Sequence, residues 1–199
     1  LLEGKIGSIV AIEPKTGEIL CMVSAPSFDP HLMVGRQRGV NHLELSRDGW
    51  KPLLNRAIMG SYPPGSTFKT ASMMLALEEG KASLNTTVDC SGGVYPMHGR
   101  FMKDHNWRKG GYGVLTFSQI LEQSSNIGVS RIIDDAFKTN PQAYVDGLRR
   151  MGVGIPLDLP FVGKGEPRFP QPNSKIRYWS KSDLPWMSIG YVSQQPVIS

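Results

Sequence analysis

The sequence lacks the long apolar runs and the leader pattern of a chain that enters a membrane by itself. Its 199 residues contain no run of 18 apolar residues, the length needed to span a bilayer. The first five residues, Leu1 to Lys5, do not show the charged and then apolar order of a signal peptide. The chain also begins without Met. We therefore expect a piece of a longer protein, whose membrane anchor would lie outside these residues.

Cysteine is nearly absent, which excludes a fold built on several disulfides. The two cysteines, Cys21 and Cys90, stand far apart, and neither lies in a Cys-x-x-Cys pattern. We interpret both as small buried apolar side chains, with a single bridge between them as the alternative. This count leaves the redox compartment open.

Long runs of one charge are also missing. The 22 basic residues exceed the 17 acidic ones and give a formal net charge of +5, but no five basic residues are consecutive. No aromatic residues alternate with them, so the pattern indicates a solvated surface and not a nucleic-acid stripe. An anionic partner is compatible with this charge. The composition, 40% hydrophobic and 9% aromatic, allows a buried core and excludes disorder.

The first 50 residues predict a hairpin followed by an irregular segment. Residues 6–12 and 18–23 are rich in β-branched and apolar residues, and residues 14–17 supply a turn between them. Two strands alone are marginally stable, so we expect this hairpin to begin a larger antiparallel sheet. Residues 25–50 are polar and interrupted by Pro and Gly, which predicts a long surface segment without regular structure.

A central helix is predicted after the double proline at 63–64. Proline excludes helix before it, and Gly80 is a typical residue just past a helix end, so the helix runs from Ser66 to about residue 79. Its apolar side is expected to include Phe68, Ala71, Met74 and Leu75.

Further helices are predicted between residues 116 and 152. Thr116 and Gln119 have the spacing of a capping box, which begins a helix that ends near Gln123. The later helices are expected at 127–137 and, after the Asn140-Pro141 start signal, at 141–151. Residues 152–185 contain six prolines and predict a functional rim or a self-packed loop. The fold class is α+β, with an antiparallel sheet flanked by helices.

Ser66 and Lys69 are the first candidates for chemistry. They lie three residues apart at the start of the central helix, so they share one face and could hydrogen-bond. Serine becomes nucleophilic when a base takes its proton, and a buried lysine with a lowered pKa can be that base. The helix N-terminus, including the Ser66 N–H, would stabilise an oxyanion. The plain alternative is a capping serine and a solvated lysine.

The triplet Ser124-Ser125-Asn126 is the second candidate. It interrupts two helical stretches, where a hydroxyl and an amide could point into a cleft. Capping of the following helix is the alternative explanation. A second Ser-x-Asn at Ser83 to Asn85 follows Gly80 and is interpreted as an ordinary turn.

These segments together resemble the transpeptidase domain of penicillin-binding proteins. The resemblance rests on Asn55 to Ala57, on Tyr62 to Lys69 with its Ser-x-x-Lys, and on Ser124 to Asn126. Flanking stretches resemble class B members, most closely the septal, cell-division type of the Bacteroidetes kind, at residues 12–20, 26–30, 104–107 and 184–191. The likeness covers nearly the whole chain.

The resemblance implies a serine acyl-transferase that cross-links peptidoglycan. Ser66 would accept the acyl group, Lys69 would be its base, and Ser124 would relay a proton to the departing group. Asn126 would bind the substrate's peptide. The substrate would be the D-Ala-D-Ala end of a stem peptide, and β-lactams would acylate Ser66. No cofactor is implied.

One departure from the family concerns its third motif, Lys-Thr/Ser-Gly. The only copy in this sequence, Lys15-Thr16-Gly17, precedes Ser66 and sits in the predicted hairpin turn. We therefore interpret residues 1–199 as a partial domain that lacks the C-terminal strands and the third motif. The fragment alone is expected to acylate slowly or not at all.

The resemblance leaves two other functions open, a β-lactam-sensing receptor and a serine β-lactamase. It also implies a parent anchored to the periplasmic face of the inner membrane, with divisome or glycosyltransferase proteins as partners. A metal site formed by Cys90, His98, Asp104 and His105 is the remaining alternative, but their spacing matches no common zinc pattern. We expect loop roles for these four side chains.

Overall fold

The computed structural model describes residues 1–161, 163–167, 170–175 and 178–191. The chain forms two compact units. The first comprises Leu1–Ser61 and Asp158–Glu166, and the second comprises Tyr62–Leu157 and the described residues from Pro167 onward. Within the described ranges, no helix combines the length and apolar character needed to cross a membrane.

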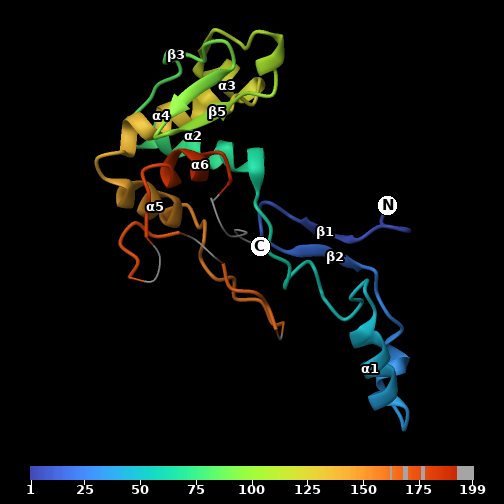
Figure 1. Cartoon of the computed structure of the whole chain (residues 1–199). Helices are drawn as coiled ribbons and strands as arrows, with labels where there is room; N and C mark the ends of the chain where they lie inside the picture. The colour runs from blue at the N-terminus through green and yellow to red at the C-terminus, as the bar shows by residue number, and fades with distance from the viewer. Residues whose placement is uncertain (162, 168–169, 176–177, 192–199) are drawn as a thin grey trace. The chain divides into compact units, whose positions relative to one another are not determined.

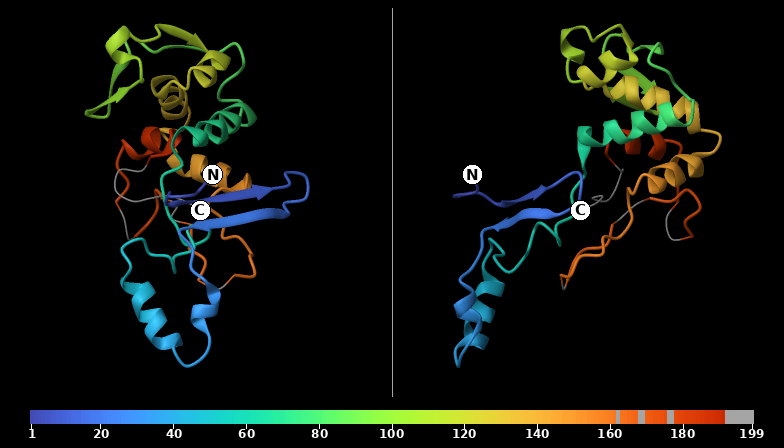
Figure 2. Two further views of the ribbon diagram at one scale, coloured as in Figure 1. Left: turned by 90° about the vertical axis from the view of Figure 1, so that its right-hand side faces the viewer. Right: turned by 180° about the vertical axis from the view of Figure 1, so that it is seen from behind.

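The first unit contains the predicted hairpin. Strands β1 (Gly7–Ile12) and β2 (Ile19–Ala25) pair antiparallel, with an irregularity in register near the turn (Figure 2). Gly17 in that turn has φ +77°, a conformation that glycine adopts without steric cost. The sequence Lys15-Thr16-Gly17 therefore occupies a hairpin turn, as predicted. In the described residues these two strands pair only with each other.

The segment after the hairpin contains a helix that the sequence analysis did not predict. A 3-10 helix, η1 (Pro30–Met33), is followed by α1 (Arg38–Arg47). The expectation of an irregular segment over 25–50 is therefore wrong. The helix buries none of its residues, so the apolar periodicity that identifies most helices is absent from it.

The second unit contains the remaining helices and strands (Figure 1). Its helices are η2 (Gly65–Thr67), α2 (Phe68–Glu78), η3 (Trp107–Lys109), α3 (Phe117–Glu122), α4 (Asn126–Phe137), α5 (Pro141–Arg150) and α6 (Asp183–Ser188). Its strands are β3 (Thr87–Asp89), β4 (Val94–Met97), β5 (Arg100–Lys103) and β6 (Val114–Thr116). Strand β3 pairs with β6 and β4 with β5, both antiparallel.

The predicted helix starts in this unit are confirmed by their hydrogen bonds. Thr116 Oγ1 accepts from the Gln119 N–H at 3.3 Å, and Gln119 Oε1 accepts from the Thr116 N–H at 2.9 Å, which completes the capping box. Asn140 Oδ1 accepts from the Ala143 N–H at the start of α5. Helix α6, in contrast, begins at Asp183, inside the stretch 152–185 that was expected to be a rim or loop.

Helix α2 is central to the second unit, but its buried side differs from the prediction. Met73 and Leu75 are fully buried, whereas Met74 is exposed. Met74 stands six residues after Phe68, which is about 240° around an α-helix, whereas Leu75, at seven residues, returns to the side of Phe68. The predicted apolar stripe is therefore wrong at Met74.

A buried polar contact joins α2 to two other helices. Ser72 Oγ lies 2.7 Å from the carbonyl oxygen of Ser188 in α6 and 2.8 Å from the Tyr144 hydroxyl in α5. All three residues are buried, so each polar atom here has a partner inside the protein. Because hydrogen bonds are directional, this contact fixes the register of the three helices.

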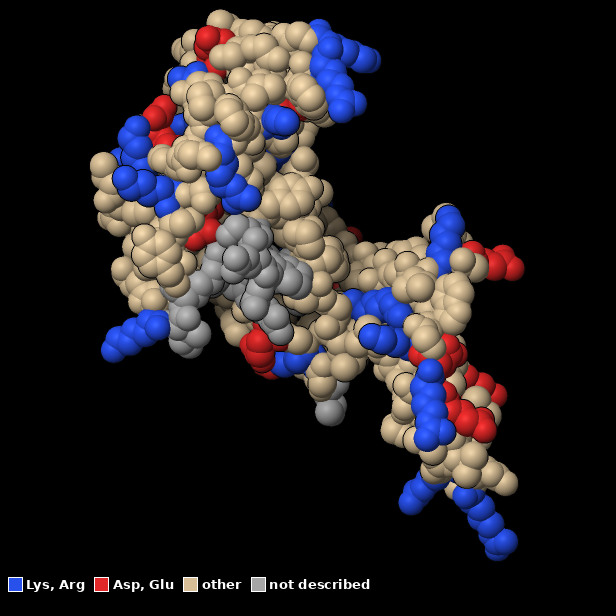
Figure 3. Space-filling view, in the orientation of Figure 1, with Lys and Arg blue, Asp and Glu red and all other residues tan. Residues whose placement is uncertain are grey.

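The fold class is α+β, as predicted, with antiparallel two-stranded sheets beside helices. The prediction for the cysteines is half right, since both are free thiols but only Cys90 is buried and Cys21 is exposed. On the face in Figure 3, Lys and Arg side chains lie in several separate groups with Asp and Glu between them. This distribution matches the scattered basic residues of the sequence.

Candidate active site

A close backbone contact fixes the chain just before Ser66. Gly65 has φ +60°, and its N–H donates to the carbonyl oxygen of Gly190, which follows α6, at 3.2 Å. A Cβ atom on Gly190 would lie 2.1 Å from the Gly65 carbonyl oxygen, closer than any side chain can approach. Only glycine fits at position 190. The stretch 184–191 therefore supports the backbone that carries Ser66.

Ser66 itself lies on the 3-10 turn η2, with its side chain exposed. The predicted helix over 66–79 thus begins as a 3-10 turn and becomes α-helical at Phe68. Within the described chain, Ser66 Oγ makes no hydrogen bond to Lys69 Nζ, so the predicted direct contact is absent. The reason is that Lys69 donates to another serine.

Lys69 is buried and points at Ser124. Its Nζ donates to the Ser124 carbonyl oxygen at 2.6 Å and to Ser124 Oγ at 3.0 Å. Burial lowers the pKa of Lys69 to about 8, and the negative charge of Asp104 opposes this shift. The alternative of a solvated lysine is excluded, because only 2% of Lys69 is exposed. Part of the Lys69 amine population is therefore neutral close to physiological pH and could accept a proton.

Ser124 ends α3 in a conformation that favours glycine. The Ser124 N–H donates to the Leu121 carbonyl oxygen at 3.0 Å, and the Ser125 N–H donates to the Ile120 carbonyl oxygen at 2.9 Å. These two bonds form the motif in which the residue after the C-cap is left-handed, usually Gly. Ser124 takes that place with φ +51°. A non-glycine residue there costs about 1 kcal/mol or more.

The other two residues of the triplet begin α4. Ser125 is the N-cap, and its Oγ accepts from the Gly128 N–H at 2.9 Å. Asn126 is the first helical residue, and its Nδ2 donates to the Lys103 carbonyl oxygen at 2.7 Å. The capping explanation is therefore confirmed for Ser125. Ser124, in contrast, faces Lys69, and Asn126 is held at the edge of the same turn.

Asp104 joins this site although the sequence analysis gave it no role there. It follows β5, is 1% exposed, and accepts from Ser125 Oγ at 2.8 Å and from the Ile127 N–H at 3.0 Å. No periodicity marks it, because the contact joins residues more than 20 positions apart. The sequence analysis singled out residues 104–107 only as part of the family resemblance, and no local pattern gave Asp104 a place in the site.

The four side chains considered for a metal site do not converge. Cys90 and Asp104 both contact Ser125 Oγ. His98 Nε2 instead pairs with Asp134 Oδ1 at 2.8 Å, and His105 contacts the Tyr112 hydroxyl. In the described part of the chain, no three His, Cys, Asp or Glu side chains form a group that could hold an ion.

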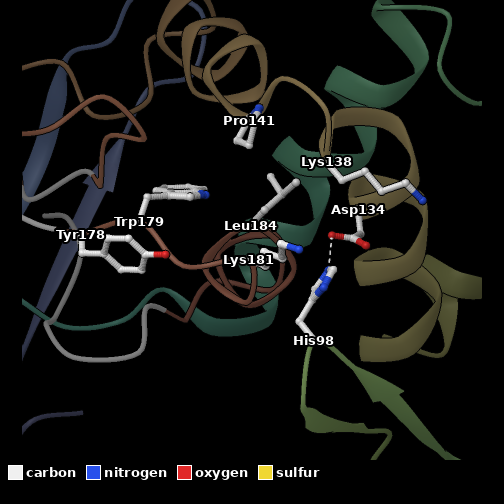
Figure 4. Close-up of a pocket in the computed structure, with 8 residues that line it drawn as sticks. All are labelled: His98, Asp134, Lys138, Pro141, Tyr178, Trp179, Lys181 and Leu184. Carbon is white, nitrogen blue, oxygen red and sulfur yellow. Dashed lines mark hydrogen bonds and ion pairs between the residues drawn. The ribbon is translucent and has the colours of Figure 1, made fainter.

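A cavity of about 280 Å³ lies near the other end of α4 (Figure 4). None of the four predicted site residues lines it. Its lining residues are His98, Asp134, Lys138, Pro141, Tyr178, Trp179, Lys181 and Leu184. Asp134 follows Asn126 by eight residues, which is about 12 Å along a helix. The cavity is therefore separate from the Lys69 and Ser124 contact.

The geometry around Lys69 suits one kind of chemistry. A buried amine that is partly neutral can accept a proton, and the Ser124 hydroxyl bonded to it can pass a proton on. An exposed serine on the turn before the same helix can be acylated, and α2 begins directly after it. This arrangement is compatible with acyl transfer through a seryl ester.

Comparison with known proteins identifies the family. Residues 7–194 match the model described as the penicillin binding protein transpeptidase domain, so the chain belongs to that family. The class B resemblance seen in the sequence is thereby confirmed. Its septal and Bacteroidetes refinement is not part of what the match establishes.

Individual relatives agree with this assignment. The chain is 33% identical over 196 residues to the peptidoglycan D,D-transpeptidase MrdA of Acinetobacter baumannii, covering 95% of this chain and 28% of that protein. It is similar to the crystal structure of Pseudomonas aeruginosa PBP2 in complex with WCK 5153, with a TM-score of 0.85, 27% identity, and coverage of 98% and 44%. A peptidoglycan synthase complex that coordinates polymerization and crosslinking matches with a TM-score of 0.80, 30% identity, and coverage of 96% and 33%. The chain thus spans less than half of each of these relatives.

Proposed function

We propose that this chain is the acylating part of a peptidoglycan D,D-transpeptidase. The observation that carries the proposal is the double hydrogen bond from the buried Lys69 amine to Ser124, one helical turn from Ser66. The named relative with 33% identity, a peptidoglycan D,D-transpeptidase, supports the same reaction. The substrate is the D-Ala-D-Ala end of a stem peptide, and β-lactams acylate the same serine.

The reaction proceeds in two acyl transfers. Ser66 Oγ attacks the carbonyl carbon between the two D-Ala residues and gives its proton to the neutral Lys69 amine. Lys69 passes this proton through Ser124 to the departing D-Ala nitrogen, the C–N bond breaks, and a seryl ester forms. The amine of a neighbouring strand then attacks the ester carbonyl, an amide bond forms, the ester C–O bond breaks, and the proton lost by the amine goes through Lys69 to Ser66 Oγ. Asn126 holds the substrate's peptide through its amide.

Labelling with a fluorescent penicillin tests the nucleophile. In the parent protein, the label is expected on Ser66 and is expected to disappear in Ser66→Ala. Ser83→Ala is the matched control, because Ser83 begins the second Ser-x-Asn and lies in a turn bonded to Thr86. It is expected to label like the parent protein. Labelling that persists in Ser66→Ala would assign the nucleophile to another residue.

We also propose that a Lys-Thr-Gly or Lys-Ser-Gly strand from the parent completes the site. The Lys-Thr-Gly of this sequence lies in the turn between β1 and β2, where its side chains serve turn geometry. The 199 residues alone are then expected to label slowly or not at all. Rapid and stoichiometric labelling of Ser66 in the isolated chain would overturn this part of the proposal.

The rate of deacylation separates this enzyme from the two other functions. A transpeptidase holds the penicilloyl group for minutes or longer, whereas a β-lactamase releases it within seconds. A receptor also holds the group but carries a signalling segment before residue 1. Release within seconds in the complete domain would contradict the transpeptidase assignment.

The cellular setting is the last part of the proposal. We infer a division-site enzyme on the periplasmic face of the inner membrane, anchored by a segment of the parent and acting with a glycan polymerase. The resemblance of residues 104–107 and 184–191 to septal members supports the division role, and the matched synthase complex supports a polymerase partner. A fluorescent fusion of the parent should concentrate at midcell. A uniform signal along the side wall would contradict the division role.

A further inference from the structure

Asp104 is a buried acid that contacts the turn carrying two of the site residues. It lies directly after β5, and its side chain is enclosed between that strand and the start of α4. Its backbone is held as well, since its N–H donates to the Gly93 carbonyl oxygen and its carbonyl accepts from the Trp107 N–H. The carboxylate is therefore held in one position and does not change rotamers as a surface side chain would.

Each oxygen of this carboxylate has a partner at the start of α4. Oδ2 accepts from Ser125 Oγ at 2.8 Å, and Oδ1 accepts from the Ile127 N–H at 3.0 Å. Ser125 Oγ in turn accepts from the Gly128 N–H at 2.9 Å. Two of the N–H groups that every helix leaves unpaired are thus satisfied by one buried network. A negative group at this place is also favoured by the helix dipole.

The residues that this network fixes lie on both sides of Ser125. Ser124 has φ +51°, a conformation that persists only where neighbouring contacts determine it. Asn126 is held from the other side by the Lys103 carbonyl oxygen, one residue before Asp104. The chain at 103–104 therefore holds Ser125 and Asn126 together, and with them the adjacent Ser124 carbonyl to which Lys69 donates.

We propose that Asp104 is a positioning residue for the acyl transfer: its carboxylate holds the turn that carries Ser124 and Asn126, and its charge acts on the Lys69 amine. This inference rests on the proposed function. The charge of Asp104 stabilises the protonated form of Lys69 and so opposes the effect of burial on its pKa. Asp104 thereby fixes both the geometry of the relay and the pH range in which Lys69 is a base.

Other titratable groups also face this region. The Cys90 thiol contacts Ser125 Oγ, and burial is the largest reason why its pKa is raised. Burial and then the charge of Asp104 raise the pKa of the Tyr112 phenol, whose hydroxyl contacts His105. Arg131 and Asp89 act on Cys90 from α4 and β3. His105 contacts the Tyr112 hydroxyl, so His105→Gln is the control for any contribution of that imidazole to the pH profile.

The test is the pH profile of penicillin acylation in the parent protein. Asp104→Asn keeps the shape of the side chain and one acceptor but removes the charge. We expect the acid limb of the profile to move to lower pH and the plateau rate to fall about tenfold, which corresponds to about 1.4 kcal/mol. Asp134→Asn is the matched control, the same change in a buried acid on α4, and the acid limb and plateau of its profile should stay in place.

Ser125→Ala separates the two parts of the role and keeps the test valid if Asp104→Asn fails to fold. It removes the hydroxyl between Asp104 and Gly128 but keeps the charge, so the plateau should fall while the acid limb stays. Two results would overturn the inference. One is an acid limb of the pH profile that does not move in folded Asp104→Asn, and the other is a plateau rate in folded Ser125→Ala equal to that of the parent protein. If Ser66→Ala labels like the parent, the proposed function fails instead, whatever the Asp104 variants do.

Discussion

The C-terminal ends of α2 and α3 have the same backbone geometry but carry different residues. At the end of α2, Gly80 takes φ +62°, its N–H donates to the Leu77 carbonyl oxygen, and the Lys81 N–H donates to the Ala76 carbonyl oxygen. The end of α3 repeats this pair of bonds, with Ser124 in the place of Gly80. Glycine is the residue that this left-handed position favours.

The difference separates a structural helix end from a functional one. Gly80 is exposed, and no atom lies within 4 Å of a Cβ built on it, so only backbone geometry decides its identity. Ser124 accepts from Lys69 with both its carbonyl and its hydroxyl oxygen. The proposed role of the hydroxyl as a proton relay would account for a serine in this unfavourable conformation. Strained positions of this kind cluster at functional sites.

The first expected effect is that of Ser124→Ala on catalysis. The change removes the hydroxyl and leaves a residue with similar backbone preferences, so the helix end should remain. Loss of a proton relay typically lowers a rate by about 10²- to 10⁴-fold. Acylation of the parent by a fluorescent penicillin should fall by that factor, while its urea unfolding midpoint stays nearly the same. A parental acylation rate would show that Ser124 is no more functional than Gly80.

The second effect concerns the Lys69 amine, which contacts Ser124, whereas no atom lies within 4 Å of a Cβ built on Gly80. The pKa of Lys69 in the folded protein is about 8, below its ordinary value of 10.5. The protonated form is thus disfavoured by folding, and this cost is fully present below pH 8 and disappears as the pH rises from 8 to 10.5. A shift of this size corresponds to about 3 kcal/mol.

Lys69→Met should therefore abolish acylation and stabilise the protein at pH 7. The lost hydrogen bonds to Ser124 offset part of the gain, so we expect a net increase of about 1 to 2 kcal/mol in the free energy of unfolding. Urea denaturation at pH 7 and pH 10 measures it, and the advantage over the parent should shrink at pH 10. An advantage that grows with pH would contradict the assigned direction of the pKa shift.

Much of the fold could be predicted because the relevant signals are local. The capping box of Thr116 and Gln119, the Asn140-Pro141 start and the Gly80 stop each act within a few residues. Helix α1 was missed because it buries no residue, so no apolar period marks it. Met74 was misplaced because a spacing of six residues from Phe68 does not return to the same face of an α-helix.

The site residues were predictable only where they stand in short sequence motifs. Ser66, Lys69, Ser124 and Asn126 stand in short motifs, so the sequence identified them as candidates. It did not show that Lys69 contacts Ser124 and not Ser66, since that contact spans 55 positions. Asp104 has no local signal, because its partners Ser125 and Ile127 are defined by the packing of β5 against α4.

The third effect is structural and belongs to Gly80. Gly80→Ala introduces a Cβ atom at φ +62° without contacting any neighbour, so only the backbone conformation is penalised. We expect the free energy of unfolding to fall by about 1 kcal/mol. Acylation should keep the parental rate, because the end of α2 at Gly80 is more than two turns beyond Lys69. A change in acylation rate larger than about twofold would remove the distinction between the two helix ends.

The smallest effect is the reverse exchange, Ser124→Gly. Glycine adopts the left-handed conformation without the Cβ penalty, but it also gains freedom in the unfolded chain, which offsets part of the benefit. We expect the free energy of unfolding to rise by about 0.5 kcal/mol relative to Ser124→Ala, with acylation equally low in both variants. The pair differs only in backbone preference, since both lack the hydroxyl. If the two variants have equal stability, Ser124 carries no strain, and its φ of +51° is then no sign of function.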